Sequence, residues 1–300
     1  MTNHHIAKYL ACALAMALSM FGAGQARAQD LVVGGKNFTE QLILSDMTAQ
    51  YLRAKGYGAE LKSGLGTTLM RSALESGQLD IVWEYTGTAL IVYHHIEDKL
   101  PPEQIYAKVK ELDAPKNLVW LDESGLNNTY AFAMPRKTAE KYGINTLSDL
   151  AARFNGEDKS LLMGVDYEFA SRPDGLGPMQ ALYDFSTRRA EVKQMDPGLV
   201  YTALKNEQLF VGLTYASDGR IKGFDLKLLE DDKNFFPPYK ATPVVRKEIL
   251  DKNPELAAQL DALAAKIDTG KMTEMNKRVD IDQEPVSKVA ADFLKESGLI

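Results

Sequence analysis

Short apolar segments alternate with longer amphipathic ones in the first third of the chain. Three largely apolar runs of strand length share polar or turn-forming flanks: residues 31–34, 59–61 and 79–83. Between them, apolar residues recur with helical spacing over 42–52 and 69–74, and Gly56 and Gly77 would end the two helices. This alternation predicts a parallel sheet with helices on both faces.

A second unit of mixed pattern follows. Its strand candidates, and those that flank it, are residues 117–121, 129–134, 161–165, 208–213 and 224–229. We predict two α/β lobes, with residues 29–129 and 218–300 in lobe I and residues 130–217 in lobe II. The chain would then cross between the lobes twice, an arrangement that suits hinge closure over a cleft.

The first 28 residues have the pattern of a cleaved signal peptide. Lys8 gives the positive start, residues 10–21 form an apolar run, and Ala26-Arg27-Ala28 is a small-x-small cleavage pattern. Because the run is short for a bilayer span, we expect cleavage before Gln29 rather than a membrane anchor. Cys12, the only cysteine, lies in this segment, so we expect no disulfide and no cysteine-bound metal in the mature chain.

The charge of the chain argues against nucleic acid or an anionic membrane as the main partner. The sequence has 35 basic and 41 acidic residues; removing residues 1–28 takes away Lys8 and Arg27 and no acid, which leaves 33 basic residues and a net charge of −8. Only His94 and His95 remain as histidines. Adjacent residues do not share a helix face, so we expect no metal site and place both histidines on a helix surface.

Signatures of enzymes are missing from the sequence. It has no P-loop, no Gly-x-Ser-x-Gly elbow and no His-Glu-x-x-His, and the mature chain offers few nucleophile–base pairs. Gly64-Leu65-Gly66 precedes a helix, but it lacks the remaining glycine of a dinucleotide site and is interpreted as a turn. We therefore expect neither catalysis nor a cofactor.

Several of the thirteen tyrosines lie at strand ends or in polar turns. Tyr85 follows the run 79–83, Tyr130 follows Asn127-Asn128-Thr129, and Tyr215 precedes Ser217-Asp218-Gly219. Tyr239 follows Phe235-Phe236-Pro237-Pro238. Each tyrosine alone could be a packing residue at the edge of the core, but strand ends in open α/β sheets are also where small ligands bind.

Four motifs occur in order along the chain: Gly35-Lys36-Asn37-Phe38-Thr39-Glu40-Gln41, Trp83-Glu84-Tyr85-Thr86-Gly87-Thr88, Ser171-Arg172-Pro173-Asp174-Gly175 and Ala216-Ser217-Asp218-Gly219-Arg220-Ile221. With them the mature chain resembles the substrate-binding proteins of osmoprotectant ABC importers, which capture glycine betaine, choline, carnitine or related quaternary amines. The resemblance implies a two-lobed α/β fold of the periplasmic-binding-protein type, with a ligand cleft between the lobes and two chain crossovers.

The resemblance also implies an aromatic cage for a quaternary ammonium group. Carried over by motif, the cage is Tyr85, Tyr130, Tyr215 and Tyr239, and Tyr239 rests on spacing and its Pro-Pro-Tyr context. Tyr167, Phe169 and Tyr201 are substitutes if one assignment is wrong. The physics agrees, because a trimethylammonium group donates no conventional hydrogen bond, whereas each ring face contributes about 0.5–2 kcal/mol.

A betaine also carries a carboxylate, which Arg172 could hold in a bidentate fork while Lys36 and Thr88 donate further bonds. Gln41 and Asn128 match positions that touch the polar end of the ligand in this family. Each has a plainer alternative: Arg172 as a surface charge, Lys36 as a solvated strand end, and Gln41 and Asn128 as capping or turn residues. Glu84 should point away from the cleft, because strand neighbours alternate.

We therefore predict a monomeric periplasmic protein that captures a quaternary ammonium ligand by hinge closure and delivers it to a permease in the inner membrane. Glycine betaine is the first expectation, since Arg172 and Thr88 suit a carboxylate; choline, carnitine and proline betaine are the others. The alternatives are a secreted enzyme acting on small amines or choline esters, and a receptor that reports its ligand to a membrane sensor.

Overall fold

The computed structural model describes residues 31–300 apart from residues 97, 99 and 159. The predicted signal peptide, with Cys12, lies outside the described residues. Within the described part of the chain, no helix has the length and apolar character needed to cross a membrane.

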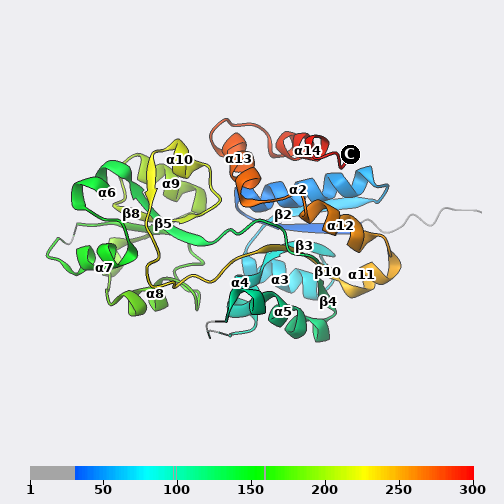
Figure 1. The fold of residues 1–300 in the computed structure, drawn as a ribbon, viewed down its shortest axis with the longest axis horizontal. Helices are drawn as coiled ribbons and strands as arrows, with labels where there is room; N and C mark the ends of the chain where they lie inside the picture. The colour runs from blue at the N-terminus through cyan, green and yellow to red at the C-terminus, as the bar shows by residue number, and fades with distance from the viewer. Residues whose placement is uncertain (1–30, 97, 99, 159) are drawn as a thin grey trace, which may run out of the picture. The chain divides into compact units, whose positions relative to one another are not determined.

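The first sheet has five strands in the order β2-β1-β3-β10-β4 (Figure 1). Their bounds are β1 (Leu31–Lys36), β2 (Ala59–Leu65), β3 (Ile81–Tyr85), β4 (Leu118–Trp120) and β10 (Ala241–Arg246). β1 runs parallel to β2 and β3, whereas β10 is antiparallel to both β3 and β4. The prediction of a parallel sheet is wrong for β10. The chain reaches β10 on its return from the second lobe, and β10 lies antiparallel to its neighbours β3 and β4.

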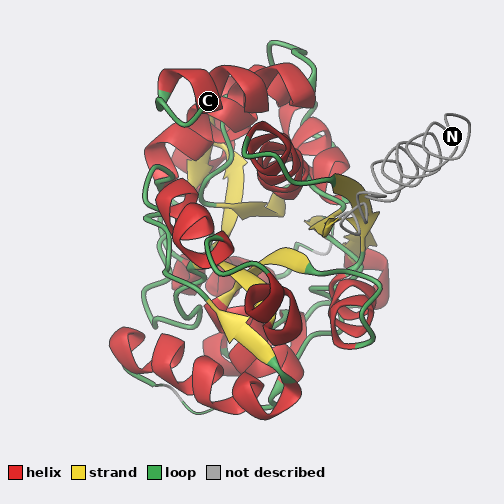
Figure 2. Ribbon diagram, turned by 90° about the vertical axis from the view of Figure 1, so that its right-hand side faces the viewer, coloured by secondary structure: helices red, strands yellow, loops and turns green. Residues whose placement is uncertain are grey.

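Helices flank this sheet, as Figure 2 shows for the molecule as a whole. They are α2 (Thr39–Ala54), α3 (Thr67–Glu75), α4 (Thr86–Thr88), the π-helical η1 (Ala89–Tyr93), α5 (Pro102–Asp113), the short η2 (Ala114–Lys116), α11 (Lys247–Lys252), α12 (Leu256–Ala264), α13 (Thr269–Asp280) and α14 (Val286–Glu296). Apolar residues of α2 such as Ile43, Leu44 and Met47 are fully buried in one cluster with Trp83 of β3. This packing fixes α2 against the strand that carries Tyr85.

The second sheet also has five strands, in the order β7-β6-β8-β5-β9. Its strands are β5 (Tyr130–Pro135), β6 (Met163–Val165), β7 (Val192–Gln194), β8 (Val211–Tyr215) and β9 (Leu226–Leu228), and its helices are α6 (Arg136–Tyr142), α7 (Leu147–Asn155), α8 (Leu176–Tyr183), the short η3 (Arg189–Glu191), α9 (Pro197–Lys205) and α10 (Arg220–Gly223). β5 pairs antiparallel with β8 and β9, and β6 pairs parallel with β7 and β8.

Two segments join the sheets, residues 121–129 and residues 229–240 (Figure 1). They are hydrogen-bonded to each other, because the backbone N–H of Asn128 donates to the backbone carbonyl of Tyr239 at 3.0 Å. The return to lobe I was predicted at residue 218. That boundary is too early, because β9 is still paired with β5 in the second sheet.

His94 does not lie on the surface as predicted. Its Nε2 atom is 2.9 Å from Oδ1 of Asp113, whose side chain is fully buried and also accepts hydrogen bonds from Arg71 and from Nε1 of Trp120. The histidine, which directly follows η1, therefore belongs to a buried polar cluster, whereas its neighbour His95 is exposed.

Candidate ligand-binding site

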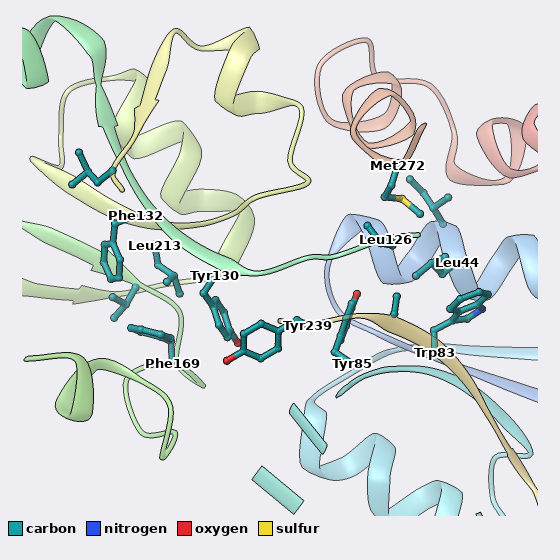
Figure 3. Packing of buried hydrophobic residues seen from close by; sticks show 14 of the residues in the cluster. Leu44, Trp83, Tyr85, Leu126, Tyr130, Phe132, Phe169, Leu213, Tyr239 and Met272 are labelled. Carbon is teal, nitrogen blue, oxygen red and sulfur yellow. The ribbon is translucent and has the colours of Figure 1, made fainter. Parts of the chain in front are cut away.

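Four tyrosines from the two sheets and the second joining segment line one pocket. Tyr85 is the last residue of β3, Tyr130 the first of β5, Tyr215 the last of β8, and Tyr239 lies in the second joining segment. Figure 3 shows the rings of Tyr85, Tyr130 and Tyr239 close together between the two sheets. The strand ends of both lobes thus supply the aromatic wall of a cavity of about 90 Å³.

The Tyr130 ring contacts the ring of Tyr215 at a tilted angle and that of Tyr239 edge to face. The Tyr130 ring centroid lies 5.5 Å from that of Tyr215 and 5.4 Å from that of Tyr239, the latter at an interplanar angle of 81°. Phe38, which precedes α2, stacks on Tyr215 at 5.2 Å and lies 6.3 Å from Tyr85. Phe38 therefore links the tyrosine of lobe I to those of lobe II.

Carboxyl groups accept hydrogen bonds from three of the four tyrosine hydroxyls. The Tyr85 hydroxyl donates to Oε1 of Glu40 at 2.6 Å, the Tyr239 hydroxyl to Oδ2 of Asp174 at 2.6 Å, and the Tyr215 hydroxyl to Oδ2 of Asp166 at 3.2 Å. Burial raises the pKa of each of these phenols well above its ordinary value, so the rings stay neutral. Neutral rings backed by acidic groups form an environment that favours a cation.

The guanidinium of Arg172 faces the pocket but is already paired. Its Nε and Nη2 atoms donate to Asp174 at 2.7 and 2.6 Å, and Nη2 lies 3.4 Å from the hydroxyl of Thr88. The fork predicted for a ligand carboxylate is therefore directed at Asp174. Nη1 donates no hydrogen bond to any residue that the structure describes. The guanidinium carbon lies 5.3 Å from the Tyr130 ring centroid.

Lys36 is likewise paired with a protein carboxylate. Its Nζ donates to Oε1 of Glu84 at 2.7 Å, both side chains being buried, and lies 5.1 Å from the Tyr85 ring centroid. Glu84 does not line the pocket; besides Lys36 it accepts hydrogen bonds from the Tyr93 hydroxyl and from its neighbour's amide N–H.

Eight of the nine residues predicted for the site line this one pocket: Lys36, Tyr85, Thr88, Asn128, Tyr130, Arg172, Tyr215 and Tyr239. The ninth, Gln41, lies behind it, where its Nε2 donates to the Tyr85 hydroxyl at 3.0 Å and to the Trp83 carbonyl at 3.1 Å. Of the substitutes, Tyr167 lines the pocket but is 64% exposed. Phe169 packs against Tyr130, and the Tyr201 hydroxyl accepts from the amide N–H of Tyr215.

Comparison with known proteins identifies the family of this chain. The family OpuAC, described as the substrate binding domain of the ABC-type glycine betaine transport system, matches residues 29–296. The chain belongs to this family. A glycine-betaine-binding protein of Pseudomonas aeruginosa is 51% identical over 97% of this chain and 94% of its own length, and the carnitine transport binding protein OpuCC of Listeria monocytogenes is 36% identical over 93% and 91%.

A solved structure described as a glycine betaine/carnitine/choline ABC transporter has a TM-score of 0.72 at 33% identity, and the match covers 90% of this chain and 99% of that one. As a member of the family, this protein is a substrate-binding component of an ABC transport system and not an enzyme. The predicted resemblance and the predicted two-lobed α/β fold are confirmed.

Several residues in or around the pocket were not predicted from the sequence. Four of them lie within the recognised motifs, namely Phe38, Glu40, Asp174 and Ser217, and a fifth, Asp166, directly follows β6. Glu40 is buried and makes three hydrogen bonds, and Asp174 orients both Arg172 and Tyr239. The motifs contain four of these residues, but only the packing reveals which way each side chain points.

Proposed function

We propose that this protein captures glycine betaine in the periplasm, closes over it, and delivers it as a monomer to an ABC permease in the inner membrane. The observation that carries the proposal is the cage itself, in which four tyrosines from both lobes converge on one pocket. The 51% identical relative named as a glycine-betaine-binding protein supports the choice of ligand.

The cage suits the cationic end of the ligand. A trimethylammonium group gains about 0.5–2 kcal/mol from each ring face it contacts. Asp166 and Asp174 add negative charge behind the rings of Tyr215 and Tyr239. Binding of about −8 kcal/mol, which corresponds to a micromolar dissociation constant, is within reach of several such contacts.

The carboxylate end would lie against Thr88 and the Nη1 edge of Arg172. Both groups line the pocket, and Arg172 keeps a donor that no described residue uses. Choline is the second candidate, because Arg172 and Lys36 are each already paired with a carboxylate of the protein.

Calorimetric titration with glycine betaine, choline, carnitine and proline betaine tests this function. We expect glycine betaine to bind most tightly, with a dissociation constant in the micromolar range or below. Tight choline binding without a response to glycine betaine would reverse the preference. A folded protein that binds no quaternary amine would refute the proposed function.

A further inference from the structure

Glu40, in the first turn of α2, joins both lobes through one closed set of polar contacts. Its Oε1 lies 2.6 Å from the Tyr85 hydroxyl and 2.9 Å from Nδ2 of Asn128, and its Oε2 lies 2.6 Å from the Ser217 hydroxyl. Ser217 in turn lies 2.9 Å from Oδ1 of Asn128. We call these four residues the Glu40 ring. Glu40 and Tyr85 belong to lobe I, Asn128 to the first joining segment, and Ser217 to the turn after β8.

The hydrogen atoms available to the ring are one too few when Glu40 is ionised. Four close contacts need four hydrogens, but Tyr85, Ser217 and the facing Asn128 amide supply one each. Because Ser217 has a single hydroxyl hydrogen, it cannot donate to both Glu40 and Asn128. Turning the Asn128 amide over does not help, because its oxygen would then face Oε1 of Glu40, again without a hydrogen between them.

A proton on Glu40 completes the set. Oε2 then donates to the Ser217 oxygen, Ser217 donates to Oδ1 of Asn128, and Asn128 and Tyr85 both donate to Oε1. We propose that Glu40 carries a proton in the folded protein and that this proton makes Glu40 a positioning residue, which fixes the cage and fastens lobe II to lobe I beside the hinge.

The surroundings of Glu40 favour the neutral form. The side chain is buried, and burial raises its pKa from 4.5 to about 7 despite the hydrogen bonds from Ser217, Tyr85 and Asn128. The titratable groups that face it are Tyr85 from β3 and Asp218 from the turn after β8, and the charge of Asp218 raises the pKa further.

The charged groups beyond these neighbours are largely paired with one another. Arg220 donates to Asp218 at 2.6 Å and lies 3.3 Å from Asp280 of α13. Lys36, over the Tyr85 ring, is paired with Glu84. Among the described residues, Glu40 therefore has no basic hydrogen-bond partner that would hold it ionised.

The Glu40 ring contacts or adjoins every wall of the cage. Tyr85 is a member of it, and the backbone N–H of Asn128 donates to the backbone carbonyl of Tyr239. Tyr130 lies two residues after Asn128, and Tyr215 two residues before Ser217. Loss of the proton leaves one oxygen–oxygen contact of the ring without a hydrogen, so we expect the cage to loosen as Glu40 ionises.

The test follows ligand affinity and the carboxyl group separately, since the effect on affinity rests on the proposed function. Calorimetry with glycine betaine from pH 6 to 9 compares the wild type with Glu40→Gln, whose amide can donate to Ser217 as the protonated acid does. Asp46→Asn on the same helix, outside the pocket, is the matched control. Carbon-13 NMR of the ligand-free protein follows the Glu40 carboxyl, assigned by its absence in Glu40→Gln.

We expect wild-type affinity to fall above about pH 7, approaching tenfold for each pH unit, and to be nearly constant in Glu40→Gln. Asp46→Asn should follow the wild type. Equal pH profiles for the wild type and Glu40→Gln would overturn the positioning role, and a carboxyl titration near the ordinary value of about 4.3 would overturn the proton assignment. Titration near 7 in a protein that binds no quaternary amine would support the proton and refute only the proposed function.

Discussion

Tyr130 and Tyr215 are register partners across β5 and β8, and their ring centroids lie 5.5 Å apart. An antiparallel ladder thus holds two walls of the cage at a fixed separation within lobe II. Tyr85 comes from lobe I and Tyr239 from the joining segment. In the proposed function, closure of the lobes therefore brings all four rings onto one ligand, and closure and recognition are the same event.

Removal of one ring from the lobe I side should weaken binding strongly. We expect Tyr85→Ala to lose at least about tenfold in affinity for glycine betaine, because a cation–π contact and its buried surface are lost together. Calorimetry measures the change, and Tyr142→Ala, a 40% exposed tyrosine of α6, is the matched control. An unchanged dissociation constant in folded Tyr85→Ala would remove Tyr85 from the cage.

Phe38 should matter although it was not predicted from the sequence. It stacks between Tyr85 and Tyr215, and such aromatic pairs contribute about 0.5–1.5 kcal/mol each. We expect Phe38→Ala to weaken glycine betaine binding about threefold to tenfold, and Phe38→Leu, which keeps apolar volume, to weaken it less. Equal affinities for all three proteins would show that the stack does not support the cage.

Arg172 should set the choice between glycine betaine and choline. In Arg172→Gln the charge of Asp174 is no longer balanced, so the pocket becomes more negative. We expect glycine betaine affinity to fall about tenfold or more, while choline affinity is kept or rises. Competition titrations with both ligands measure the ratio, and Arg172→Gln combined with Asp174→Asn restores the charge balance. A parallel loss for both ligands would contradict this role.

The Asp113 cluster should contribute to stability. Asp113 is fully buried and binds Arg71, His94 and Trp120. Asp113→Ala removes the carboxylate that pairs with Nη1 and Nη2 of the buried Arg71 guanidinium, whose Nε stays paired with Glu75. We expect the free energy of unfolding in urea to fall by about 3–5 kcal/mol. Glu111→Ala, which breaks only the exposed pair with Lys108, should change it by less than about 1 kcal/mol. Similar stabilities for the two variants would refute the importance of the cluster.

The pH dependence of stability should report on Glu40. Its pKa is raised from 4.5 to about 7, so between these values the folded protein keeps a proton that the unfolded chain has released. The contribution of Glu40 to the free energy of unfolding therefore falls as pH rises through this window. We expect the stability difference between the wild type and Glu40→Gln to change by roughly 3 kcal/mol between about pH 4.5 and 8. Urea unfolding measures this difference at each pH. A difference that stays constant across this range would contradict the raised pKa.

Much of the fold could be predicted because its strands are short apolar runs that end at glycines or polar residues. β10 escaped prediction because Pro243 lies in its middle and opposes Trp83, where a proline argues against a central strand. β9 was expected, but three residues do not reveal which sheet they join, and this placed the boundary of lobe II too early.

The cage tyrosines were predicted because the family resemblance carries them over by motif, and their places beside recognisable segments agreed with it. Their carboxylate partners could not, because hydrogen bonds such as those of Glu40 and Asp174 join residues brought together by packing rather than by spacing. The same holds for His94, whose partner Asp113 lies nineteen residues away at the end of α5.

The central claim, that rings recognise a positive charge, is tested most directly with a copy of the ligand that lacks the positive charge. In 3,3-dimethylbutanoate a carbon atom replaces the nitrogen of glycine betaine, so the shape and the carboxylate are kept and the cation is lost. Calorimetry of the wild-type protein with both compounds should give binding at least about a hundredfold weaker for the carbon analogue. Equal affinity for the two compounds would contradict recognition by an aromatic cage.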